Sequence, residues 1–318
     1  VEGGKMKNKK VLYLIIIVIV LILIGGGLYF ILTKDKNGNE DNKTSNKTTT
    51  TTNNVKIVNL NSKTRPFAVM INNHPTARAH HAGLQDAYII YEFIVEGGMT
   101  RYLALFKDQD TAKIGSVRSS RHYFLDYALE NDAIYVHYGW SPQAQYDISN
   151  LGVNNINGIS ESESSFWRVK DKSAPHNVAT STAKILSIAE RKGYKTTSTK
   201  ESVLKYVTDE VELTDGQSAE KITIPYSYSN DVEYTYDATT KRYQRYSKGV
   251  KETDWSTGEN ITTKNIIITY CDNYTLTDTE NKGRQGLKNI GTFDGYYITD
   301  VTVGSTLMQF NLSEKTGS

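Results

Sequence analysis

The chain has 318 residues, which leaves room for two domains of ordinary size once its ends are set aside. Its 37 Lys and Arg residues nearly balance 35 Asp and Glu residues, so overall charge gives no support for a nucleic-acid partner and none is expected. The single cysteine, Cys271, cannot form an internal disulfide, and we interpret it as a buried core residue.

The N-terminal segment gives the clearest physical signal. Residues 11–32 are mostly apolar and uncharged, and a helix of that length spans a hydrocarbon core of about 30 Å. Four lysines precede this run, so we expect residues 1–10 in the cytoplasm, a single-pass anchor in the cell membrane and extracytoplasmic soluble domains. No cysteine for lipidation follows the run. The alternative is a cleaved signal peptide, although no small-residue cleavage pattern stands out.

Residues 33–54 are expected to form a flexible linker. Residues 35–54 have no apolar side chain, so they cannot bury enough surface to offset the entropy of ordering. Folded structure is therefore expected from residue 55 onward.

The segment 55–195 alternates apolar runs with longer amphipathic ones, which predicts an α/β domain. Each expected helix begins with Ser, and two end at Gly. The expected strands are 67–72, 87–95, 101–106 and 133–138, and the expected helices are 119–131, 141–152 and 181–193.

From residue 201 the pattern changes to Tyr- and Thr-rich alternation. Residues 233–249 predict a β-hairpin, and 265–270 and 295–303 predict short strands. The sequence therefore predicts a smaller, mainly antiparallel β domain over 200–318, and an α+β fold for the folded part.

Arg101, Arg118 and Arg121 are candidate anion-binding residues. With Ser116 or Ser119 as N-cap, Arg118 and Arg121 fall in or beside the first turn of a helix, where a cation costs a few tenths of a kcal/mol. An anion bound at the helix terminus would turn this conflict into binding, with Arg101 as a third donor. The alternative is that these arginines form structural salt bridges. The acidic residues available for that are Glu92, Glu96, Asp126 and Asp132.

Glu92 and Glu96 are the acidic candidates. On one strand they would face the same side about 13 Å apart, farther than the roughly 5–9.5 Å of glycosidase carboxylate pairs. Gly97 and Gly98 indicate that the backbone turns after Glu96. We therefore interpret Glu96 as a site residue and Glu92 as a structural one.

Two histidines lie at positions where functional sites are common, namely a strand end and a polar loop. His137 ends an expected strand, and His176 lies in the loop "SAPHNV" beside Asn177, with an ordinary pKa near 6.5. No metal site is expected, because the histidines of "NNHPTARAHH" lack a known ligand spacing. No cofactor is expected either, since no phosphate-binding or dinucleotide motif is present.

Three long blocks carry a family resemblance: "RPFAVMINNHPTARAHHAGLQDAYIIYEFIVEGGMTRYLALF", "IGSVRSSRHYFLDYALENDAIYVHYGWSPQA" and "FWRVKDKSAPHN". They resemble the YerB-type family of bacterial envelope proteins, which has two domains of unassigned function. The resemblance resumes at "NIIITY" and "GRQGLKNIGTFDGYYITD". The positions that match the family pattern are Glu96, Gly97, Gly98, Arg101, Gly115, Arg118, Arg121, His137, Pro175, His176 and Asn177.

The chain departs from that family in three places. It has a plain transmembrane segment where a lipid anchor is usual, and "RAHHAGL" replaces a segment without histidines. After residue 300 the usual continuation is missing, so we expect a truncated or frameshifted C-terminal domain.

Two functional hypotheses follow, together with a purely structural role as a third. In the first, the exported domains bind an anionic cell-envelope ligand, such as a phosphate of a teichoic-type polymer or a carboxylate of peptidoglycan. In the alternative, the same cluster belongs to an envelope hydrolase or transferase. The expected ligand-binding residues are Arg101, Arg118, Arg121, Asn177, Gly97 and Gly98, and the expected catalytic residues are Glu96, His137 and His176.

Overall fold

The computed structural model describes residues 59, 61–202, 204, 218–228, 230–269, 273–277, 285–287 and 306–310. Within these ranges no helix combines the length and apolarity needed to cross a membrane. The predicted anchor at 11–32, the predicted linker at 33–54, Cys271 and the expected strand at 295–303 lie outside them.

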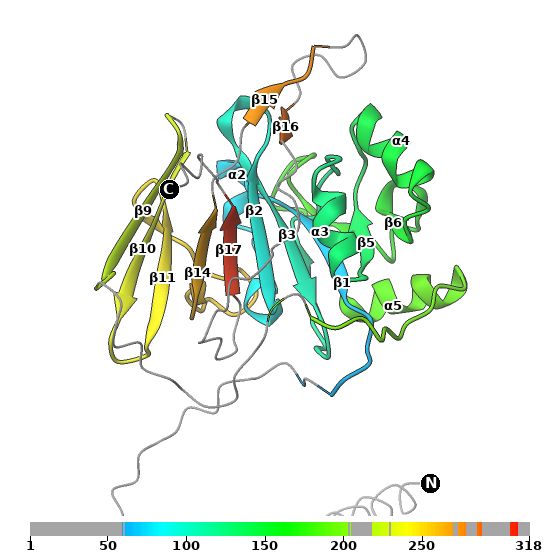
Figure 1. Ribbon diagram of the computed structural model, residues 1–318, viewed down its shortest axis with the longest axis horizontal. Helices are drawn as coiled ribbons and strands as arrows, with labels where there is room; N and C mark the ends of the chain where they lie inside the picture. Colours follow the sequence, from blue (N-terminus) through cyan, green and yellow to red (C-terminus); the bar gives the residue numbers. More distant parts are fainter. Residues whose placement is uncertain are drawn as a thin grey trace, which may run out of the picture. The chain divides into compact units, whose positions relative to one another are not determined.

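A seven-stranded sheet forms the centre of the folded part, in the order β14-β17-β2-β3-β1-β5-β6 (Figure 1). Strand β3 is antiparallel to both β1 and β2, whereas β5 and β6 continue parallel to β1. On the other side, β17 and β14 continue parallel to β2. The bounds are β1 Phe67–Asn72, β2 Ile89–Ile94, β3 Thr100–Phe106, β5 Ile134–His137, β6 Asn155–Asn157, β14 Ile266–Thr269 and β17 Thr306–Phe310.

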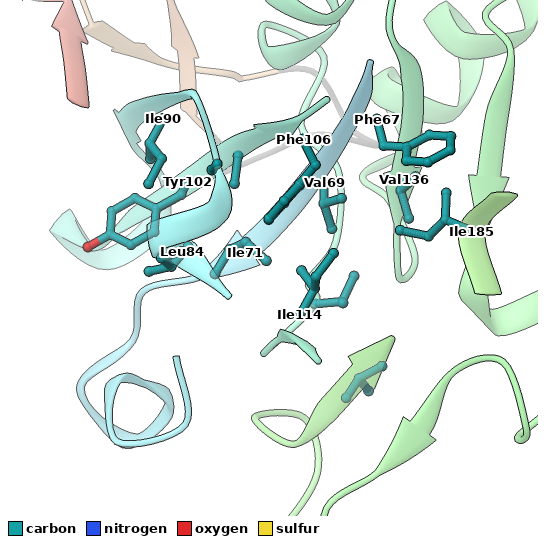
Figure 2. Close-up of a cluster of buried hydrophobic side chains, with 14 of the residues drawn as sticks. Phe67, Val69, Ile71, Leu84, Ile90, Tyr102, Phe106, Ile114, Val136 and Ile185 are labelled. Carbon is teal, nitrogen blue, oxygen red and sulfur yellow. The ribbon is translucent and has the colours of Figure 1, made fainter. Parts of the chain in front are cut away.

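Both faces of this sheet are buried. Along β1, Val69 and Ile71 belong to one hydrophobic cluster, while Ala68 and Met70 belong to another, as the period of two in a strand requires. Figure 2 shows the first cluster, with Val69 of β1 near Val136 of β5. Each such aliphatic side chain contributes about 1.5–3 kcal/mol when fully buried.

Helices cover the two faces. The first cluster also takes in side chains of α5 (Thr182–Arg191) and of the C-terminal strands, and the second takes in side chains of α3 (Phe124–Glu130) and α4 (Pro142–Asn150). Ser141 and Ser181 cap α4 and α5, each accepting a hydrogen bond from a backbone N–H three residues on. The short helices are α2 Pro75–Arg78 and the 3₁₀ turns Leu84–Asp86, Glu96–Gly98 and Gly158–Ser160.

The C-terminal half forms an antiparallel sheet of five strands, in the order β12-β11-β10-β9 with β13 also paired to β11. The predicted hairpin over 233–249 is confirmed as β10 and β11. Their bounds are β9 Lys221–Ser227, β10 Asn230–Asp237, β11 Arg242–Ser247, β12 Val250–Lys251 and β13 Thr262–Thr263. Two smaller sheets pair β4 (Ile114–Gly115) and β7 (Trp167–Arg168) with β8 (Val178–Thr180), and β15 (Asn273–Thr275) with β16 (Gln285–Leu287).

The predicted mixed α/β and antiparallel β parts are confirmed, with one difference at β14 and β17. Both strands come from the C-terminal half but extend the N-terminal sheet in parallel. The physical reason lies in β2, whose sequence IIYEFI is buried on both faces. Such a strand needs a backbone partner on each side, and β17 occupies the side that β3 leaves open.

Candidate anion site at the carboxyl end of strand β1

The segment carrying Arg118 is held in extended form between strands. The backbone N–H of Arg118 donates to Met70 O at 2.9 Å, and its carbonyl accepts from Tyr138 N at 2.9 Å. The helix that follows begins only at Phe124, with Tyr123 as N-cap. The prediction that both arginines stand in or beside the first turn of a helix is therefore wrong for Arg118, because backbone bonds to neighbouring strands take the N–H groups that a helix would use. Arg121 does lie beside the helix, and its carbonyl accepts from Phe124 N at 3.2 Å.

Arg118 differs from Arg101 and Arg121 in the hydrogen bonding of its guanidinium. Its side chain is half-buried, and among the described residues no atom accepts a hydrogen bond from its guanidinium. Burial lowers its pKa and the charge of Arg121 lowers it further, while Glu96 opposes both effects. An arginine remains charged at neutral pH despite such a shift. Arg118 therefore presents a partly desolvated positive charge with no carboxylate in ion-pair distance in the described part of the chain.

Arg121 is internally paired. Its Nε and Nη2 donate to the two carboxylate oxygens of Glu96 at 2.7 and 2.6 Å, and Nη1 donates to Ser120 O at 2.7 Å. This fork geometry is the strong form of an ion pair. The alternative of a structural salt bridge therefore applies to Arg121. Because Arg121 holds both oxygens of Glu96, this carboxylate does not fully neutralise the charge of Arg118.

Arg101 lies on the same side of the cluster but deeper. It stands opposite Asn72 in the β1–β3 pairing, and its Nη1 donates to Ser119 O at 2.5 Å. Burial lowers the pKa of Arg101, and the charges of Arg121 and Arg118 lower it further. Three arginines and one carboxylate therefore share this region, which carries an excess of positive charge.

Glu96 follows the end of β2 and begins the turn Glu96–Gly98. Gly97 and Gly98 have φ of 70° and 68°, so glycine serves here for its left-handed backbone. A Cβ on Gly97 would meet no atom within 4 Å, which argues against a close backbone approach there. Burial raises the pKa of Glu96, but the hydrogen bonds and charge of Arg121 outweigh burial and hold it at about 2.

His176 is the fourth predicted site residue of this region, and it lies beside His74, which was not among the predicted site residues. The rings of His74 and His176 stack with centroids 4.6 Å apart. Burial lowers the pKa of both histidines, and the positive charge of Arg118 contributes to the lowering. Asn72, the last residue of β1, lies 2.9 Å from His176 Nδ1. His74 and Asn72 were missed. The available signal was the polar run "NNHP" directly after a buried strand, where α/β sheets place ligands.

His137 does not join this group. It is fully buried, with Nδ1 bonded to Gly139 O at 2.8 Å and Nε2 lying 3.2 Å from Asn155 Oδ1. Burial lowers its pKa to about 4, despite these two contacts. We therefore give His137 a structural role at the end of β5.

Asn177 is also turned away from the arginines. Its side chain donates to Val169 O and Lys172 O and accepts from Arg168, which fixes its own loop. It also lines a small open hollow, together with His80, Lys113, Ser116 and Trp255.

Glu92 has the structural role expected for it. It is fully buried, and its carboxylate pairs with Arg245 of β11 at 2.9 and 3.0 Å. Arg245 also pairs with Glu252 at 3.2 Å, so this buried network joins the central sheet to the five-stranded sheet.

Comparison with known proteins gives consistent matches. The family described as "Protein of unknown function (DUF3048) N-terminal domain" matches residues 51–195, and its C-terminal counterpart matches 222–305. "Putative lipoprotein YerB" of Bacillus subtilis (strain 168) is 37% identical over 207 residues, which make up 65% of this chain but only 62% of that relative. A crystal structure of the B. subtilis YerB protein matches with a TM-score of 0.67 at 32% identity, over 78% of this chain and 91% of that one.

Proposed function

The chain belongs to the DUF3048 family, and we propose that it is a membrane-held envelope protein that binds an anionic group at Arg118. The observation that carries this proposal is the half-buried guanidinium of Arg118, which has no counter-ion among the described residues. A charge taken partly out of water is costly unless something pairs with it. An oxyanion would supply that partner.

The electrostatics of the surroundings favour the same ligand. Glu96 is engaged by Arg121 at 2.6 and 2.7 Å, so two cations remain in excess. Partial burial also strengthens each charge–charge interaction relative to bulk water. A guanidinium binds phosphate or carboxylate oxygens in a planar, two-pronged manner.

Binding fits the region better than catalysis. With a pKa of about 2, Glu96 is ionised and a very weak base at neutral pH. His137 is buried with both ring nitrogens engaged, so it offers no proton to a substrate.

The envelope location is part of the proposal. YerB is described as a lipoprotein in its name, and residues 11–32 of this chain have the length and apolarity of a membrane anchor. A flexible linker over 33–54 would have a root-mean-square span of about 25 Å. It would hold the folded part within reach of anionic polymers at the outer face of the membrane.

The proposal predicts salt-sensitive retention on an immobilised poly(glycerol phosphate). We expect the full chain, in an uncharged detergent, to be retained at low salt and released as ionic strength rises past about 0.15 M, because screening weakens charge pairing. Arg118→Gln should weaken retention roughly tenfold or more, as expected when a hydrogen bond to a charged group is lost.

The matched control is Arg191→Gln, which removes an equal charge at the end of α5 from a side chain that is 63% exposed, while its partner Glu161 keeps Lys192 at 3.6 Å. It should leave retention nearly unchanged. Failure of the wild-type chain to bind at low salt, or equal losses for the two variants, would contradict the proposal.

A further inference from the structure

The hydrogen bonds around Asn72 fix the protonation pattern of His176. Asn72 Oδ1 accepts from the backbone N–H of His74 at 3.1 Å. The Nδ2 group of the same amide therefore faces His176, whose Nδ1 lies 2.9 Å away. An amide NH₂ group only donates, so His176 Nδ1 accepts and the proton of the neutral ring is on Nε2.

His74 is fixed in the same way by a different donor. The backbone N–H of Thr76 donates to His74 Nδ1 at 3.2 Å, so the ring proton is again on Nε2. The two rings stack with an interplanar angle of 27°. Among the residues that the structure describes, neither Nε2 atom has a protein partner.

The surroundings favour the neutral form of both rings. Burial lowers the pKa of His74, and the charges of Arg78 and Arg118 lower it further. Burial likewise lowers the pKa of His176, with added effects of His74, Arg118 and Lys172. Each ring therefore offers one N–H and has no free lone pair, so His176 is a donor and not a general base.

We propose that the anion bound beside Arg118 presents only oxygens that carry no proton, as a phosphodiester or a sulfate ester does. Arg118 supplies charged donors, and His74 and His176 each supply an Nε2–H donor. A ligand oxygen that carries a proton would face donors and lose a hydrogen bond, whereas an ionised oxygen would accept. This inference names the ligand class of the proposed function and rests on it.

Sulfate and hydrogen phosphate provide a closely matched test. At pH 8 both are dianions of similar size, and they differ mainly in the single proton on phosphate. We expect sulfate to bind the full chain about threefold to tenfold more tightly in calorimetry, which corresponds to one neutral hydrogen bond. Equal or tighter binding of hydrogen phosphate would overturn the inference, because an acceptor such as Glu96 would then have to reach the anion.

Substitution of His176 gives a second test. In His176→Gln the amide nitrogen lies near the place of Nε2, and in His176→Asn it lies near the place of Nδ1. We expect the Gln variant to keep sulfate affinity within about twofold and the Asn variant to lose about threefold to tenfold. The reverse order would overturn the inference. Long-range ¹H–¹⁵N spectra of the wild-type rings should show Nε2–H for both histidines, and an Nδ1–H form would also overturn it.

Two further arms separate this inference from the proposed function and identify the source of the diester. If sulfate, dimethyl phosphate and acetate all fail to bind at low salt, the proposed function fails. If they bind but sulfate does not bind more tightly than hydrogen phosphate, only the ligand class fails. Binding to poly(glycerol phosphate) without binding to phosphatidylglycerol vesicles would support the class and identify a polymer as the source. Binding to the vesicles without binding to the polymer would contradict the proposed function.

Discussion

Replacing Arg245 with methionine is expected to lower the free energy of unfolding by about 3–5 kcal/mol. Arg245 is 2% exposed, and its guanidinium pairs with the buried carboxylates of Glu92 and Glu252. Without it, the buried carboxylate of Glu92 has no cation within ion-pair distance among the described residues, and that of Glu252 keeps only His81, at 3.8 Å. Tyr234 would also lose its hydrogen-bond donor. Urea denaturation of wild-type and variant chains measures the difference.

The control for this variant is a pair of the same chemistry at the surface. Lys221 pairs with Glu233 at 2.7 Å, but its side chain is 60% exposed. Lys221→Met should cost no more than about 1 kcal/mol, because water screens the pair and solvates each partner after its loss. A similar small cost for Arg245→Met would show that the buried network does not stabilise the join between the two sheets.

Acid is expected to destabilise the protein by about 3 kcal/mol through His137 alone. Burial lowers its folded pKa to about 4, whereas an unfolded histidine titrates near 6.5. The unfolded chain therefore takes up the proton first as pH falls. The contribution is fully present above pH 6.5 and is lost progressively between pH 6.5 and about 4.

The check is urea denaturation at several pH values, comparing the wild-type chain with His137→Asn. The variant removes the titrating ring but keeps an amide donor for Gly139 O. We expect it to be less stable at pH 7.5, with a stability that falls less steeply between pH 6.5 and 4. Parallel pH profiles would mean that His137 is not held neutral by its burial.

Much of the fold could be predicted from local pattern. The strands 67–72 and 101–106 and the helices capped by Ser141 and Ser181 have periodicity and end signals that agree with their tertiary contacts. The hairpin at 233–249 was found in the same way. In these places the local preference and the final environment agree.

The helix expected to begin at residue 119 is a case in which local sequence pattern gave the wrong structure. Ser119 and Ser120 have the side chains of helix caps, yet Ser120 N donates to Gly139 O at 2.9 Å and Val117 N donates to Val178 O at 2.7 Å. These partners are distant in sequence, so no local pattern indicates them. The same holds for β14 and β17, because β17 pairs Thr306 with Ile89 of β2, 217 residues earlier in the chain, and β14 pairs with β17.

The site was only partly predictable for a related reason. The sequence singled out Arg118 by an argument about a helix terminus that the structure does not support. What distinguishes Arg118 from Arg121 is the position of Glu96, which pairs with one and not the other. The donor pattern of the histidines depends on Asn72 and Thr76 and can be read only from hydrogen bonds.

The most direct measurement is a crystal structure of the chain with sulfate at low ionic strength. We expect sulfate oxygens within hydrogen-bond distance of the Arg118 guanidinium and of Nε2 on His74 or His176. An empty Arg118 at a sulfate concentration that occupies other sites would contradict it, as would a sulfate held by Arg121 after displacement of Glu96.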